Sequence, residues 1–137
     1  MKGRAAAAIA LALLLAACAT SNNDSLSYTA DRGIDSQPYP NNYRPELLAF
    51  LRTYLNDPGS VRGAMIAEPV QRTVGGRLRY VTCLRYSTRE PDGRIGAARV
   101  RAALYVDGRL DRLIEEGKDI CENVTFAPFP EMEKLGR

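Results

Sequence analysis

The segment RLRYVTCLRYST, residues 77–88, decides the fold of this chain. Along it, one set of side chains occupies every second position and is largely apolar or aromatic, while the intervening set is rich in arginine. This two-residue period is typical of a β-strand with one buried face, so we expect the first set to face a covering helix. The first set is Leu78, Tyr80, Thr82, Leu84 and Tyr86, and the second includes Arg79, Val81, Cys83 and Arg85.

Further strand and turn signals lie on both sides of this segment. Residues 61–70 form a candidate strand that a proline weakens at its end, and Gly75-Gly76 supplies the turn that follows. Residues 100–106 alternate again, and Asp107-Gly108 is a strong hairpin signal that leads into a strand around 109–115. Together these signals predict an antiparallel meander.

The end of the chain contains loop signals. A loop with Gly117 is expected to bring Cys121 back toward the sheet. Pro128 and Pro130 interrupt the tail, which leaves one predicted helical turn at 131–135.

A single helix is predicted to begin at Pro45, because proline suits the first turn and Glu46 lies favourably near the positive helix end. The turn residues 56–59 stop it. Its apolar positions follow helical spacing and are Leu47, Leu48, Phe50, Leu51, Tyr54 and Leu55. Packing on the sheet is favoured over insertion into a membrane, because a lone sheet needs one face buried. The predicted fold class is α+β: one N-terminal amphipathic helix packed on a three- to four-stranded antiparallel meander.

These segments resemble a group of small exported bacterial proteins of uncharacterised function. The resemblance is carried by three motifs and covers about residues 43–110. The motifs are Leu55-x-Asp57-Pro58-x-Ser60-Val61, then Tyr80-Val81-x-Cys83-x-Arg85-Tyr86, then Gly93-Arg94-x-Gly96. In that group a YLxDPxS helix end precedes a cysteine-bearing strand and a glycine-rich hairpin. The resemblance implies a structural role for Cys83 and no particular activity.

The N-terminus resembles a bacterial lipoprotein signal. An apolar run from Ala5 follows two positive charges and ends in the lipobox Leu15-Ala16-Ala17-Cys18. The resemblance implies cleavage after Ala17, a diacylglyceryl group on the Cys18 thiol and acylation of the new amine, with chains such as palmitate. A retained transmembrane helix is disfavoured because spanning takes about 20 apolar residues. Plain secretory cleavage, with Cys18 incidental, is the second alternative.

This reading divides the chain into three parts. Residues 1–17 are a cleaved signal peptide, 18–44 are a lipidated flexible tether rich in Ser, Asn, Asp and Pro, and 45–137 form one small domain. Ala19 stands where an inner-membrane retention signal often has Asp. The expected location is therefore the outer membrane, facing the periplasm, with the inner membrane as the less favoured alternative.

The remaining two cysteines are predicted to form a disulfide. With Cys18 assigned to lipid, Cys83 and Cys121 are an even pair in an exported protein, which usually means a bridge. A redox or nucleophilic thiol is the alternative, but the chain has no CxxC spacing and no histidine. No metal or other cofactor is expected.

The charges are distributed unevenly along the chain. Residues 72–112 carry a net charge of +6 and residues 113–133 a net charge of −5. The two regions either neutralise each other or leave a basic face for an anionic partner, such as an envelope protein, lipid head groups or a cell-wall polymer. The candidate face consists of Arg79, Arg85, Arg99 and Arg101, whose alternative partners are Asp111, Glu115 and Glu116. Nucleic acid is not an expected partner.

Two functions from different classes remain open. The favoured one is a membrane-anchored envelope lipoprotein that acts as a non-catalytic binding or structural accessory module. The alternative is a small hydrolase acting on cell-wall or lipid material, with paired carboxylates from Glu115-Glu116, Asp119 or Glu122. We do not expect an enzyme, because without histidine the chain has no Ser-His-Asp triad and no nucleophile–base pair is evident.

Overall fold

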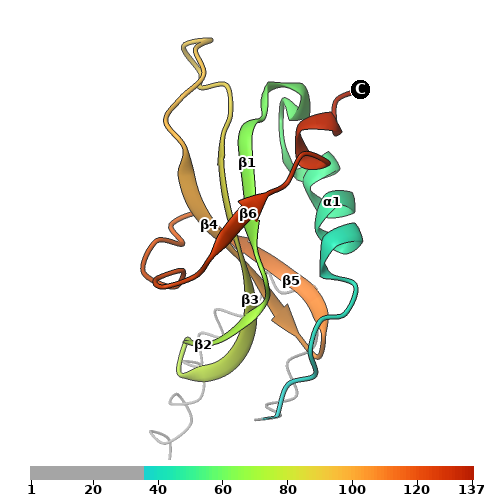
Figure 1. Cartoon of the computed structure of the whole chain (residues 1–137), viewed down its shortest axis with the longest axis vertical. Coiled ribbons are helices and arrows are strands. Elements are labelled where there is room, and N and C mark those ends of the chain that lie inside the picture. Colours follow the sequence, from blue (N-terminus) through green and yellow to red (C-terminus); the bar gives the residue numbers. More distant parts are fainter. Residues whose placement is uncertain (1–35) are drawn as a thin grey trace, which may run out of the picture.

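The computed structural model describes residues 36–137, in which six strands form one antiparallel sheet and a single α-helix packs on it (Figure 1). The strands are β1 (Arg62–Ala67), β2 (Val70–Val74), β3 (Arg77–Ser87), β4 (Arg99–Val106), β5 (Arg109–Ile114) and β6 (Phe126–Pro128). The helix is α1 (Tyr43–Tyr54), and the short 3-10 helices are η1 (Pro58–Ser60) and η2 (Met132–Lys134).

The predicted fold class is wrong. The structure is mostly sheet, and its strands do not form a three- to four-stranded meander. Their order is β5-β4-β3-β1-β6, with β2 also paired to β3. The C-terminal strand β6 therefore returns beside the first strand, which a meander does not do. Pairings between segments far apart in sequence leave no local signal, and this is why the topology was missed.

The long strand β3 pairs with two strands along the same edge. Its upper part faces β1, with Leu84 opposite Ile66, and its lower part faces β2, with Val81 opposite Val70. Pro69 lies between these partners and lacks the N–H that a ladder needs, so the predicted strand 61–70 divides there. The two tight turns are confirmed at Gly75-Gly76 and Asp107-Gly108, where all four residues have positive φ.

The strand β6, which the sequence analysis did not predict, contains a proline that its edge position tolerates. Pro128 pairs with Met65 of β1 at the edge of the sheet, where the missing N–H costs no ladder bond. Beyond it, the predicted helical turn at the tail is present as η2, and Met132 within it is fully buried.

The helix α1 begins two residues before Pro45 and ends where the chain becomes extended at Leu55. Tyr43, Leu47 and Leu51 lie four residues apart on one helix face and are its buried residues. Phe50 and Tyr54 stack on each other with ring centroids 4.9 Å apart at the flank of the helix. The buried face of α1 is therefore narrower than the predicted apolar stripe.

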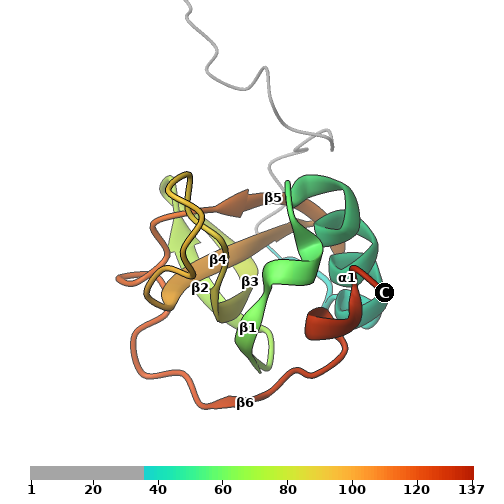
Figure 2. The same ribbon diagram turned by 90° about the horizontal axis from the view of Figure 1, so that it is seen from above.

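Both faces of the sheet are covered. On the first face, α1 and the C-terminal segment pack on Leu84, Tyr86 and Tyr105, as expected for the first set of β3 residues. Seen from above, the sheet curves, with β5 and β6 at opposite edges and α1 on the concave side (Figure 2). On the second face lies a smaller cluster around Cys83 and Cys121.

The predicted disulfide is confirmed. Cys83 on β3 and Cys121 in the loop after β5 are bonded, with Cα atoms 5.8 Å apart. The loop is also held by Arg72, which donates hydrogen bonds to the carbonyl oxygens of Ile120 (3.0 Å) and Glu122 (2.9 Å). The disulfide and the hydrogen bonds of Arg72 thus hold this loop against the second face of the sheet.

The described chain enters at the lower end of the sheet in Figure 1. Gln37 is buried and accepts a hydrogen bond from the N–H of Asp107 (2.8 Å), while Tyr39 packs edge-on against Tyr80. The packed chain thus starts before residue 45, the predicted start of the domain. The lipobox residues 15–18 lie outside the described residues. Within 36–137, no helix has the length and apolar character needed to cross a bilayer.

Candidate functional site

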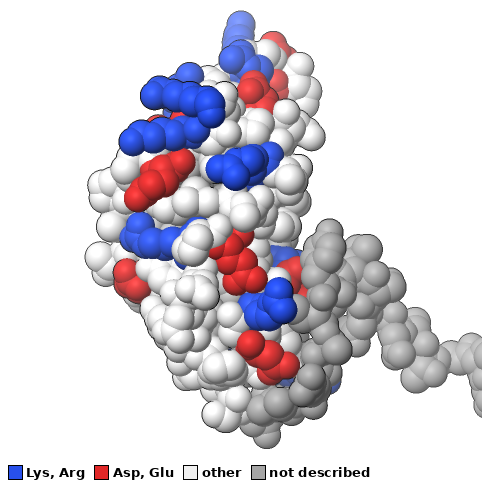
Figure 3. Space-filling view, turned by 90° about the vertical axis from the view of Figure 1, so that its right-hand side faces the viewer, with Lys and Arg blue, Asp and Glu red and all other residues white. Residues whose placement is uncertain are grey.

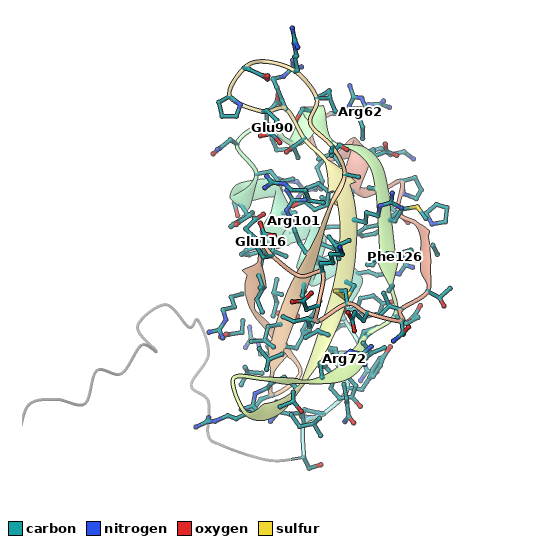
Figure 4. All side chains as sticks on the ribbon, turned by 90° about the vertical axis from the view of Figure 1, so that its left-hand side faces the viewer. Arg62, Arg72, Glu90, Arg101, Glu116 and Phe126 are labelled. Atoms are coloured by element: carbon teal, nitrogen blue, oxygen red, sulfur yellow. A yellow bond between two sulfur atoms is a disulfide. The ribbon has the colours of Figure 1, made fainter. Side chains whose placement is uncertain are left out.

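A groove of about 410 Å³ lies between the end of α1, η1 and the upper ends of β3 and β4. We call it the Arg101 groove. Its described lining residues are Tyr54, Leu55, Asn56, Asp57, Ser60, Tyr86, Thr88, Arg89, Arg99, Arg101 and Glu115. Figure 4 shows Arg101 in the upper half of the molecule, below Glu90, whereas Arg72 lies near the lower end. The volume falls in the range of small-molecule sites.

Arg101 is the best-fixed residue of the groove. Its side chain is 5% exposed, and its guanidinium carbon lies 3.9 Å from the ring centroid of Tyr86. Nε donates to Glu115 Oε2 at 2.7 Å, and Nη1 donates to the Tyr86 carbonyl oxygen at 3.3 Å. Stacking and charged hydrogen bonds together hold the guanidinium plane in one orientation.

Glu115 joins β4 to the helix. Its Oε1 accepts a hydrogen bond from the Tyr54 hydroxyl at 2.7 Å, while Oε2 is bound by Arg101. Partial burial by itself raises the pKa of Glu115, but the hydrogen bonds from Tyr54 and Arg101 outweigh it and leave that pKa lowered. The same hydrogen bond, with some burial, raises the pKa of Tyr54 to about 12. Glu115 is thus an ionised, fully engaged carboxylate at neutral pH.

Tyr86 forms the floor beneath Arg101. The residue is 1% exposed, and its hydroxyl has no hydrogen-bond partner among residues 36–137. Burial raises the pKa of Tyr86, and the charges that act on it belong to Arg101, Glu115, Tyr54 and Arg99. An unpaired buried hydroxyl is costly.

The charges of the groove leave one arginine more loosely paired than the others. Three arginines and two carboxylates line its described part, which gives one positive charge in excess. Arg89 is bound to Asp57 at 3.1 Å and Arg101 to Glu115. The longest of the three ion pairs joins Arg99 to Glu90, which lies outside the described lining, at 3.9 Å, and the Arg99 side chain is 52% exposed. Arg99 is therefore the most available cation of the groove.

The four arginines of the predicted basic face do not share a face. Residues opposite each other in an antiparallel ladder point to the same side, and Arg99 pairs with Tyr86 and Arg101 with Leu84. Both therefore lie on the helix side, whereas Arg79 and Arg85 alternate with these β3 residues and lie on the disulfide side. Arg79 is buried and Arg85 exposed. Arg101 forms an ion pair with Glu115, which is one of the acidic partners that the sequence offered as the alternative to a basic face.

The surface on the α1 side carries both signs of charge. Figure 3 shows Lys and Arg more frequent toward its upper end and interspersed with Asp and Glu. Among residues 36–137, no group of three or more His, Cys, Asp or Glu side chains is arranged to hold a metal ion.

The sequence analysis did not identify the part of the groove formed by η1 and the β3–β4 loop. Ser60 is buried, donates to the carbonyl oxygen of Asp57 and accepts a hydrogen bond from the N–H of Arg89, which fastens η1 to the β3–β4 loop. Asp57 in turn binds the Arg89 side chain. Asp57 and Ser60 both belong to the Asp57-Pro58-x-Ser60 motif quoted above, so this motif was a signal for their part of the groove. No sequence signal indicated that Arg89 would be their partner.

A second hollow, of about 540 Å³, lies between α1 and β5. It is larger than the Arg101 groove but has fewer charged side chains in its described lining. Its described lining includes Glu46, Phe50, Tyr54 and Leu110, and none of these lining residues is Lys or Arg. We therefore place the candidate site in the Arg101 groove, where fixed donors, acceptors and one surplus charge converge.

Comparison with family models, curated proteins and solved structures finds no match for the chain. The inferences on function therefore rest on the residues of the groove and on the N-terminal sequence.

Proposed function

We propose that this chain is a lipid-anchored protein of the bacterial outer membrane that faces the periplasm and acts as a non-catalytic binding module for an anionic partner. The lipobox ending in Cys18 supports the anchor. The Cys83–Cys121 bond supports an oxidising compartment such as the periplasm, because disulfides are rare in the cytosol.

The position of the Arg101 groove is the observation that carries the binding role. Gln37, where the described chain enters, bonds to Asp107 at the end of β4, whereas Arg99 and Arg101 stand at its start. An N-terminal anchor would therefore leave the groove at the far end of the strand, accessible to a partner in the periplasm.

The state of the polar groups supports a non-catalytic role. A general acid needs a pKa near the working pH, but the pKa of Glu115 is lowered by its hydrogen bonds to Tyr54 and Arg101. The Ser60 hydroxyl donates to a backbone carbonyl and accepts a backbone N–H, so no adjacent base activates it. The groove offers binding groups that are fixed, and no described residue in it stands out as a nucleophile.

Anchoring is tested by feeding cells a labelled fatty acid and comparing the wild type with Cys18→Ser. We expect the label on the wild-type protein and its loss in the variant, with the protein found in the outer-membrane fraction. Equal labelling of both proteins would contradict the anchor. A matched Cys83→Ser variant controls for thiol chemistry unrelated to the lipobox.

Binding is tested in cells with a photoreactive residue placed at position 99. Position 85 is the matched control, because both arginines are exposed and the two side chains lie on opposite faces of neighbouring strands. We expect a discrete crosslinked species from position 99 and none from position 85. The absence of any species specific to position 99 would contradict the binding role, and a trapped hydrolysis product in the groove would favour the hydrolase.

A further inference from the structure

We propose that the Arg101 groove binds the free carboxylate of a peptide-like ligand between the guanidinium groups of Arg99 and Arg101. This inference rests on the proposed binding function and names the class of ligand that the site takes.

The two guanidinium groups are placed to act together. Arg99 and Arg101 are two residues apart on β4 and hence on the same face of the sheet. Arg101 uses Nε and Nη1 in its hydrogen bonds, and Nη2 makes none with residues 36–137. Within the part of the chain that the structure describes, the Arg99 guanidinium has only its 3.9 Å contact with Glu90, and the side chain is half exposed. Donors thus remain on both residues for an incoming oxyanion.

Arg101 is already held in its binding orientation. The ring of Tyr86 beneath it and the carboxylate of Glu115 beside it restrict the side chain, which is 5% exposed. Fixing a long side chain is one of the main costs of binding, and here that cost is met in folding. Because Nε and Nη1 are already bonded, Nη2 of Arg101 supplies one fixed charged donor, and Arg99 supplies the donor for the second oxygen of a carboxylate.

The charge balance selects a single negative charge. One positive charge is in excess among the described lining residues, and it belongs to Arg99, which is loosely paired with Glu90 outside the lining at 3.9 Å. A single carboxylate can compete for this charge, whereas a phosphate dianion or an anionic polymer would bring further negative charge that Asp57, Glu90 and Glu115 repel. Asp57 binds Arg89 through Oδ2 and its side chain is 51% exposed, so its carboxylate can also accept a hydrogen bond from a ligand N–H group. A ligand that combines one carboxylate with amide or ammonium N–H donors matches this set, and the end of a peptide is such a ligand.

The tyrosines complete the site. Tyr54 is 42% exposed and offers an aromatic wall for the residue next to the carboxylate. The Tyr86 ring lies beneath the same guanidinium, with its centroid 3.9 Å from the guanidinium carbon of Arg101.

The test is an NMR titration of the full-length protein, isotopically labelled and purified from the envelope in neutral detergent. The probes are N-acetyl-trialanine with a free carboxylate, its C-terminal amide, and inorganic phosphate. We expect the acid to shift the arginine Nε–H signals and to bind about tenfold or more tightly than the amide, because the amide lacks the charge that the guanidinium groups pair with. Phosphate should bind more weakly than the acid.

The variants locate the site. Arg99→Gln should weaken binding of the peptide acid about tenfold or more, with Arg99→Lys between it and the wild type. The control Arg85→Gln removes the same charge from the opposite face and should bind like the wild type. Equal binding of acid and amide, tighter binding of phosphate, or no difference between Arg99→Gln and Arg85→Gln would each overturn the inference. If no probe binds while crosslinks from position 99 still form in cells, the ligand class is wrong and the binding function stands.

Discussion

Removal of the Cys83–Cys121 bond should destabilise the protein substantially without changing its fold. The bond joins residues 38 apart in sequence. In chain-entropy terms, opening a loop of this length enlarges the unfolded ensemble by an amount worth about 4 kcal/mol at 25 °C. A small domain has a net stability of about 5–15 kcal/mol, so this is a large share of the total.

The loss should come mainly from the unfolded state, because other contacts keep the loop in place. Arg72 still holds Ile120 and Glu122 through their carbonyl oxygens, and the apolar cluster around the sulfurs stays buried. We therefore expect a native circular dichroism spectrum for the variant Cys83→Ala/Cys121→Ala, together with a lower urea midpoint.

Urea unfolding of three forms separates the two contributions. The oxidised wild type is the reference, the reduced wild type lacks only the bridge, and the double alanine variant lacks the bridge and the sulfur atoms. The reduced wild type should lose about 4 kcal/mol, and the alanine variant somewhat more because its substitutions leave a cavity. If the reduced protein unfolds within about 1 kcal/mol of the oxidised one, the loop-closure reasoning is wrong.

Three further predictions follow from the contacts of the groove and its surroundings. A Cβ at Gly117 would lie 2.6 Å from the backbone N of Ala102, so Gly117→Ala should cost about 1–3 kcal/mol in urea unfolding, and unchanged stability would refute the close approach. Tyr86→Phe removes a buried hydroxyl that has no partner among residues 36–137, and it should leave the free energy of unfolding unchanged or raise it by about 1 kcal/mol, whereas a clear loss would reveal a partner. Because the pKa of Tyr54 is raised from 10.0 to about 12, its hydrogen bond to Glu115 contributes stability that is present below pH 10.0 and lost as the pH rises to about 12. This alkaline loss should be absent in Tyr54→Phe, and an equal loss in both proteins would contradict it.

The local elements were largely predictable because their signals are local. The alternation in residues 77–88 indicated β3. The two turn dipeptides indicated the β2–β3 hairpin and the β4–β5 hairpin. Each depends on a short period or on the φ angles that glycine and aspartate tolerate. The disulfide was predictable for a different reason, since assigning Cys18 to lipid left one possible pair.

The placement of the arginines needed the register between strands. Alternation within one strand separates Arg79 and Arg85 from their β3 neighbours, but it does not say which β4 residues share their face. That depends on Tyr86 facing Arg99, and a slip of one residue would have moved Arg99 and Arg101 to the other side. The predicted four-arginine face failed on this point.

By itself, the sequence determined the strand β3, its turns, the cysteine pair and the signal-like N-terminus, because each is encoded within a few neighbouring residues or by the count of one residue type. Only the tertiary structure decided that β6 lies beside β1 and that Tyr54, Arg101 and Glu115 meet in one groove. The physical reason is that these contacts join residues far apart in sequence, such as Tyr54 and Glu115, which are separated by 61 positions. Their formation depends on how the whole sheet pairs and curves around α1, and no local pattern records that.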